Sequence, residues 1–122
     1  MEYSNITIDA KRNRIRFYKT LLKSLGNPQY IRIMVNQEKK VFMVLSGEKG
    51  VDSIKINSHL QSDNSYEIHS KLFIEKLCEM MNWADTSCSY RIEGDLENAP
   101  ESVAFNLENA IKLNFEGIEI NE

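Results

Sequence analysis

Apolar and polar residues alternate in several short segments of the chain, a pattern typical of strands with one buried face. Residues 14–17 read Arg-Ile-Arg-Phe, and residues 6–9 read Ile-Thr-Ile-Asp, so each segment has apolar side chains at every second position. The polar residues 10–13 between them predict a turn. We therefore expect the chain to begin with two short strands joined by a polar turn.

A short helix and a hairpin are expected next. Leucines recur at helical spacing within residues 21–25, and residues 26–28 read Gly-Asn-Pro, where glycine suits left-handed backbone and proline prevents continuation. Residues 30–35 and 41–45 are rich in β-branched and aromatic side chains and are separated by a polar stretch. They predict a β-hairpin.

The same order of elements returns after a polar connector. Residues 46–64 are rich in Ser, Gly, Asp and Asn, although residues 51–56 alternate loosely enough to allow one more strand. Similar residues at 19–25 and 71–77 leave an internal duplication open. The elements expected beyond the connector are a strand at 66–68, a helix at 72–81, a strand at 88–93, a polar turn at 94–100 and a strand at 102–107.

Strand, helix and hairpin thus occur twice, which predicts a β-rich α+β fold made of two such units around one shared core. The expected parts are a basic unit at 1–57, a connector at 58–65 and an acidic unit at 66–122. One segment has two interpretations. Apolar residues between 101 and 113 also fit helical spacing, with Pro100 near a helix start, so this segment is either a strand or a helix.

Positive and negative residues are sorted along the chain. Residues 1–57 hold eleven Lys or Arg against five Asp or Glu, a formal charge of +6. Residues 58–122 hold four against thirteen, a formal charge of −9. Such asymmetry bears on binding partners more than on the fold. Six cations of the basic half lie in the first predicted hairpin and helix, namely Lys11, Arg12, Arg14, Arg16, Lys19 and Lys23.

In an extended strand, Arg12, Arg14 and Arg16 project from one face at intervals of about 6.6 Å. This interval is close to the spacing of successive phosphates along a nucleic acid strand, and arginine binds phosphate through a planar set of donors. We therefore predict that all six cations bind nucleic acid. Two other interpretations stay open: the cations form a solvated face that protects a strand edge, or the basic half docks onto the acidic half of a second copy.

The sequence offers no catalytic or metal-binding arrangement. The two histidines and two cysteines, at positions 59, 69, 78 and 88, are nine or ten residues apart, unlike the short spacings of zinc ligands. The five glycines are scattered rather than gathered in a phosphate-binding loop, and no Ser-His-Asp set can be assembled from the spacing. We expect a protein that is not an enzyme and that has no metal or cofactor.

The composition and the apolar segments also indicate in which compartment the protein is expected. With 122 residues, of which 42% are hydrophobic, the chain can bury a core. The amino-terminal residues lack a cationic lead followed by an apolar run, and no segment approaches the roughly 20 apolar residues of a membrane span. We expect a cytoplasmic protein without a membrane partner, in which the two cysteines are reduced thiols.

The first 40 residues or so resemble AbrB/MraZ-type swapped-hairpin proteins. In that superfamily a strand leads through a Gly-Arg-Ile turn and a proline to a short helix that ends in Leu-Gly, followed by a hairpin. The chain has Arg14-Ile15 and Leu25-Gly26 at the matching places, whereas Asn13 replaces the turn glycine and Tyr18 the proline. Asparagine is the next most tolerant residue for positive φ, so we expect the turn to persist.

The resemblance implies a small interlocked β-barrel, formed between two chains or between two repeats of one chain, that binds DNA through its basic strand and turn. We therefore expect a cytoplasmic module that binds double-stranded DNA, as a transcriptional regulator or antitoxin-like protein, and that is a homodimer. The alternative is a protein-interaction or self-assembly module with no nucleic acid partner.

Overall fold

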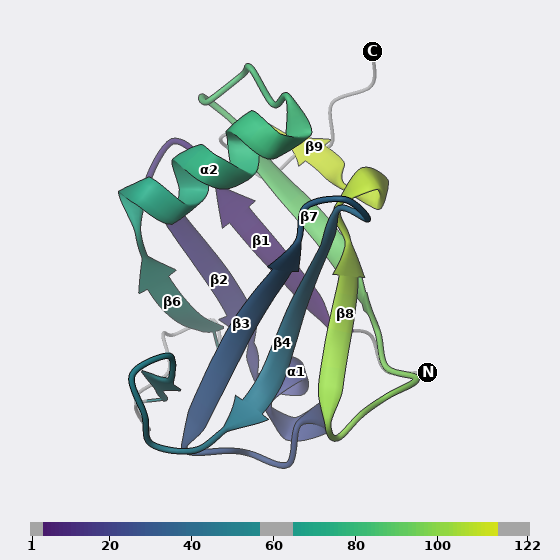
Figure 1. Cartoon of the computed structure of the whole chain (residues 1–122). Coiled ribbons are helices and arrows are strands. Elements are labelled where there is room, and N and C mark those ends of the chain that lie inside the picture. The colour runs from purple at the N-terminus through teal and green to yellow at the C-terminus, as the bar shows by residue number, and fades with distance from the viewer. Residues whose placement is uncertain (1–3, 57–64, 115–122) are drawn as a thin grey trace.

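The computed structural model of the chain describes residues 4–56 and 65–114 and shows antiparallel strands curled into a half-barrel (Figure 1). A helix lies at each end of the strands. This is a β-rich α+β fold, as the sequence predicts. The strands are β1 (Asn5–Asp9), β2 (Arg14–Tyr18), β3 (Tyr30–Asn36), β4 (Val41–Gly47), β5 (Ile54–Lys55), β6 (Ser65–His69), β7 (Ser89–Asp95), β8 (Ser102–Asn106) and β9 (Ile111–Leu113).

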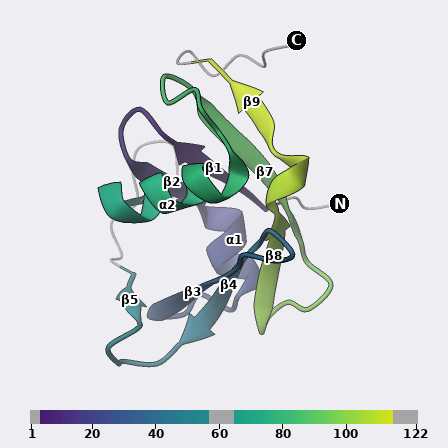
Figure 2. The ribbon, with the colours of Figure 1, turned by 45° about the horizontal axis from the view of Figure 1, so that its top comes forward.

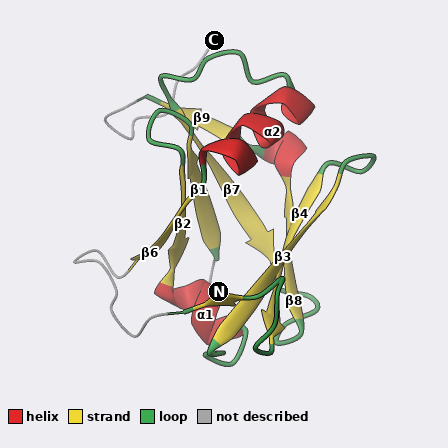
Figure 3. Ribbon diagram, turned by 60° about the vertical axis from the view of Figure 1, so that its left-hand side comes forward, coloured by secondary structure: helices red, strands yellow, loops and turns green. Residues whose placement is uncertain are grey.

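The strands follow the order β5-β3-β4-β8-β7-β1-β2-β6, and β9 pairs with β7. Viewed from the α2 end, they curl around the core from β2 through β1, β7 and β8 to β4 and β3 (Figure 2). Figure 3 shows β6 and β3 on the two sides of the open face. Three pairings, β1 with β7, β2 with β6 and β4 with β8, join the first half of the chain to the second.

One hydrophobic core serves both halves. Phe17 and Phe42 from the first half and Phe105 from the second are completely buried, and the rings of Phe42 and Phe105 meet edge to face at a centroid distance of 6.1 Å. Ile6 and Ile8 of β1, a strand between β2 and β7, are also completely buried, because their side chains point to the core face of the sheet. The alternation of the first hairpin therefore directs its apolar side chains into the core and its charged ones outward.

The helices α1 (Lys19–Ser24) and α2 (Lys71–Met81) close the two ends of the core. The α1 helix buries Leu21 and Leu22, and the chain leaves it through Gly26, whose φ of +83° favours glycine. The Ser70 side chain accepts a hydrogen bond from the backbone N–H of Phe73 at the start of α2. None of the helices in the described residues is long and apolar enough to cross a membrane.

Asn13 has a φ of 52°, so asparagine occupies the left-handed turn position, as expected. The other elements differ from the sequence expectations at few places. Residues 102–106 are a strand, and a 3-10 turn, η1 (Leu107–Asn109), leads to β9, which was not expected. Gly94 and Asp95 extend β7 and do not belong to the turn. His59 lies outside the described residues.

Gly94 marks the point where β7 changes neighbours. Residues 89–93 pair with β1, whereas Gly94 and Asp95 pair with β8. The Gly94 N–H donates to the Ser4 carbonyl oxygen at 2.6 Å. A Cβ atom at Gly94 would lie 2.6 Å from that oxygen and 2.7 Å from the Phe105 ring, which is closer than van der Waals contact allows. The junction between the two parts of the sheet therefore requires a residue without a side chain.

Replacing Gly94 with Ala should lower the free energy of unfolding by at least about 2 kcal/mol, because backbone and core must shift to admit one methyl group. Chemical denaturation measures this change. Gly50→Ala is the matched control, since its nearest neighbour to a new Cβ atom is 3.8 Å away. Equal effects of the two substitutions would contradict the close approach at Gly94.

Candidate anion-binding site

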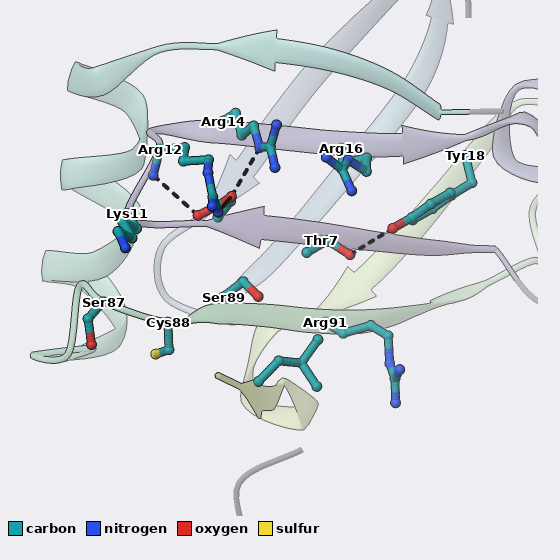
Figure 4. Close-up of a pocket in the computed structure, with 12 residues that line it drawn as sticks. Thr7, Lys11, Arg12, Arg14, Arg16, Tyr18, Ser87, Cys88, Ser89 and Arg91 are labelled. Atoms are coloured by element: carbon teal, nitrogen blue, oxygen red, sulfur yellow. Dashed lines mark hydrogen bonds and ion pairs between the residues drawn. The ribbon is translucent and has the colours of Figure 1, made fainter. Parts of the chain in front are cut away.

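A pocket of about 330 Å³ lies on the outer face of the sheet, over β1, β2 and the start of β7 (Figure 4). Its lining combines polar side chains such as Thr7 and Ser89 with one apolar wall at Leu113. Cations dominate the rest. The cationic lining residues are Lys11, Arg12, Arg14, Arg16 and Arg91.

Strand register brings these side chains together. Thr7 of β1 pairs with Arg16 of β2 on one side and with Arg91 of β7 on the other. Paired residues of antiparallel strands point to the same face, so the three side chains form a row across the sheet. The Thr7 and Tyr18 hydroxyls lie 3.2 Å apart and connect the row to the end of β2.

Asp9 fixes the arginines at the turn. Only 8% of its side chain is exposed. Its Oδ1 accepts a hydrogen bond from the backbone N–H of Arg12 at 3.2 Å, and its Oδ2 accepts from Arg12 Nη1 at 3.1 Å and from Arg14 Nε at 3.0 Å. A carboxylate within the hairpin therefore holds the turn and two guanidinium groups in one arrangement.

Glu67 of β6 has the same role on the other side of β2. Its Oε1 accepts from Arg14 Nη1 at 3.0 Å and from Arg16 Nη2 at 2.9 Å, and His69 Nε2 lies 3.3 Å from its Oε2. Burial alone would raise the pKa of Glu67, but the Arg16 hydrogen bond and the charges of Arg14, Arg16 and His69 outweigh burial and lower it. The Glu67 carboxylate thus remains ionised at pH values below the usual pKa of a glutamate side chain.

The pocket keeps a positive balance after these ion pairs. Five cations line it, against the carboxylate of Asp9 in the lining and that of Glu67 beside it. Arg14 donates to the carboxylates through Nε and Nη1, and a guanidinium has five N–H donors in total. The Arg91 side chain makes no hydrogen bond or ion pair with any residue in the described part of the chain. The site can therefore offer oriented donors to an anion.

The structure brings together four of the six cations predicted from the sequence. Lys11 and Arg12 lie in the turn, because β2 begins only at Arg14, so the expected single row of three arginines on one strand is wrong. Arg12 still reaches the pocket from the turn. The other two, Lys19 and Lys23, are exposed residues of α1, at the far end of β2, and do not line the pocket.

Sequence reasoning missed Arg91 and the role of Glu67. Arg91 lies in a segment that the alternation correctly identifies as a strand, and its outward direction follows from the buried Tyr90 and Ile92 beside it. Because Arg91 belongs to the acidic half of the sequence, its place beside the basic hairpin could not be predicted from neighbouring residues. The role of Glu67 depends on the pairing of β6 with β2, and a local sequence pattern does not predict that pairing.

Histidine, cysteine and carboxylate side chains elsewhere in the described residues are the remaining candidates for metal ligands or nucleophiles. Within residues 4–56 and 65–114, no group of three or more His, Cys, Asp or Glu side chains could hold a metal ion. Cys78 and Cys88 are free and buried, and burial together with the neighbouring Cys88 raises the pKa of the Cys78 thiol. A buried neutral thiol is a poor nucleophile.

Comparisons with known proteins do not assign the chain to a family. No protein family, no curated protein and no solved structure matches it.

Glu67→Gln should destabilise the protein by about 1–3 kcal/mol at pH 7, because two arginines lose a charged acceptor. The pKa of Glu67 is lowered in the folded state, so its contribution is complete above its usual pKa of 4.5 and is lost as pH falls through the lowered value. Denaturation of both proteins between pH 3 and 8 should therefore show the difference shrinking in acid.

Glu75→Gln is the control, because the Glu75 carboxylate is 58% exposed and lies 4.0 Å from Lys71. It should change the free energy of unfolding by no more than about 0.5 kcal/mol. A pH-independent effect at Glu67, or one as small as at Glu75, would show that the ion pairs contribute little.

Proposed function

We propose that the protein is a small DNA-binding module, a transcriptional regulator or antitoxin-like protein without catalytic activity, that holds phosphate groups in the cationic pocket. The observation that carries the proposal is the convergence of Lys11 and Arg12 from the turn, Arg14 and Arg16 from β2 and Arg91 from β7 on one pocket. Arginine offers donors in a planar fork that fits phosphate oxygens. Most protein–DNA hydrogen bonds go to the phosphate and sugar backbone.

The size of the pocket limits how much backbone it can hold. A volume of about 330 Å³ accommodates one or two phosphate groups rather than a long stretch of backbone. Two carboxylates already neutralise part of the charge. We therefore expect few phosphate contacts, modest affinity and a moderate salt dependence.

The proposal includes a swapped-hairpin-like barrel made from two repeats of one chain. Strands in equivalent places pair with each other: β2 with β6 and β4 with β8, both antiparallel, as strands related by a two-fold axis must be. Strands β5 and β9, which follow β4 and β8 along the chain, also occupy equivalent places, since β5 pairs with β3 and β9 pairs with β7. In this interpretation the second repeat became acidic while the first kept its cations.

Self-association is the second candidate function. Met34 on β3 is 51% exposed and Leu72 on α2 is 65% exposed, and both elements border the open side of the half-barrel. These exposed apolar side chains are available for contact with another protein surface. A homodimer fits both proposals, and light scattering across a range of salt concentrations distinguishes how it is held: an oligomer that dissociates as salt rises is held by the cations, and one that persists is held by apolar contacts.

The double variant Lys11→Ala/Arg12→Ala should weaken binding of a fluorescein-labelled DNA oligonucleotide about ten-fold in anisotropy titrations at low salt. The control Lys19→Ala/Lys23→Ala removes the same charge from α1 and should change affinity by no more than about two-fold. Arg14 and Arg16 are poor choices, because their removal leaves Glu67 without its partners.

Affinity of the unmodified protein should fall with salt along a log-log slope of about −1 to −2, the value expected for one or two phosphate contacts. Equal weakening by the two double variants would mean that binding follows total charge and not the pocket. Absence of any binding at low salt would remove the proposed function.

A further inference from the structure

A second depression, of about 660 Å³, lies beside the cationic pocket on the same outer face of the sheet. Arg91 lines both depressions. Figure 4 shows the Arg91 guanidinium at the border of the cationic pocket, directed away from β1 and β2. The two depressions therefore adjoin at Arg91, and together they are called the trough.

The register explains why the second depression exists. Glu93 pairs with Asn5 of β1, and Asp95 pairs with Ala104 of β8, so these side chains share the outer face. Ala104 is small, and the chain turns away from β8 through η1 before β9 returns to β7. The space left between these elements is lined by three asparagines, Asn5, Asn106 and Asn109.

The chemistry of the second depression is opposite to that of the first. Glu93 and Asp95 are exposed carboxylates that repel phosphate. The side-chain amides of Asn5 and Asn109 make no hydrogen bond with any residue of the described ranges, so their donors and acceptors are available. Ile111 adds an apolar surface next to Arg91. This end of the trough suits a neutral, planar group with hydrogen-bonding edges.

Nucleobases have this chemistry. Asparagine amides pair with the amino and ring-nitrogen groups of adenine, and carboxylates accept hydrogen bonds from the amino group of cytosine. Guanidinium planes stack on unpaired bases. A base within a duplex cannot enter the depression, because both of its faces are stacked on neighbouring bases, whereas an unpaired base can turn out of the strand.

We propose that the second depression is a base-binding subsite, so that the trough recognises a nucleotide of a single strand, with its phosphate in the cationic pocket and its base beyond Arg91. This inference rests on the proposed function, since it needs the phosphate in the cationic pocket. It narrows that function from DNA in general to unpaired nucleotides. A duplex lying along the trough would bring its phosphates against Glu93 and Asp95, which disfavours it.

Isothermal titration calorimetry with small probes tests the subsite directly. The unmodified protein should bind a nucleoside 5′-monophosphate at least ten-fold more tightly than ribose 5-phosphate or inorganic phosphate, because only the nucleotide fills both ends of the trough. A single-stranded oligonucleotide should bind more tightly than the mononucleotide and more tightly than a duplex of the same length. Adenine and cytosine nucleotides are the first to try.

Variants separate the two ends of the trough. Asn5→Ala/Asn109→Ala should reduce nucleotide affinity to that of ribose 5-phosphate and leave ribose 5-phosphate binding unchanged. Asn98→Ala, an exposed asparagine in the loop between β7 and β8 that does not line the depression, should change neither. Lys11→Ala/Arg12→Ala should weaken both ligands together. Thermal melts identify any variant that fails to fold, and Asn109→Ala alone, at an exposed position, then replaces the double variant.

The outcomes distinguish the two proposals. Equal affinity for nucleotide and ribose 5-phosphate, or duplex bound as tightly as single strand, would overturn the base subsite and leave the cationic pocket as a phosphate site. Absence of binding by every phosphate compound would overturn the proposed function itself, and the subsite with it.

Discussion

The outer face of the sheet depends on the neutralisation of two carboxylates, Asp9 and Glu67. Their side chains are only 8% and 13% exposed, and a charge withdrawn from water is costly unless opposite charges and hydrogen bonds surround it. Arg14 lies between the two carboxylates and bonds to both. Because the arginines must stay against these carboxylates, they lose the rotational freedom of surface arginines, and their remaining donors are held in place before any ligand arrives.

Charges that are sorted along the chain are mixed in space. The basic hairpin β1–β2 lies between β6 and β7, which both come from the acidic half. From one side β6 supplies Glu67, which neutralises arginines, and from the other β7 supplies Arg91, which adds a cation. Docking of the basic half onto acidic groups thus occurs in part within a single chain. Formal charges of the two halves therefore say little about the surface, because the register of the four strands β6, β2, β1 and β7 decides which charges meet on it.

The sequence predicts what is local and misses what is long-range. The alternation in β1 and β2, the turn at Asn13 and the outward cations follow from neighbouring residues, and all appear in the structure. Grouping Lys19 and Lys23 with the arginines assumed that nearness in sequence is nearness in space, but the five residues of β2 carry the chain about 17 Å away from the turn. Strand β9 is three residues long, too short for its periodicity to be recognised.

The sign of the charge reverses along β7, and this reversal limits which polyanion the face can accept. Its charged outward side chains are Arg91, Glu93 and Asp95, separated by steps of about 6.6 Å. The phosphates of a nucleic acid strand repeat at a similar interval without any change of sign. A phosphate backbone laid along β7 would therefore meet one cation, which attracts it, and then two carboxylates, which repel it. A ligand charged at one end and neutral at the other meets no such conflict, so the order of charges on one strand restricts the ligand more than the number of cations does.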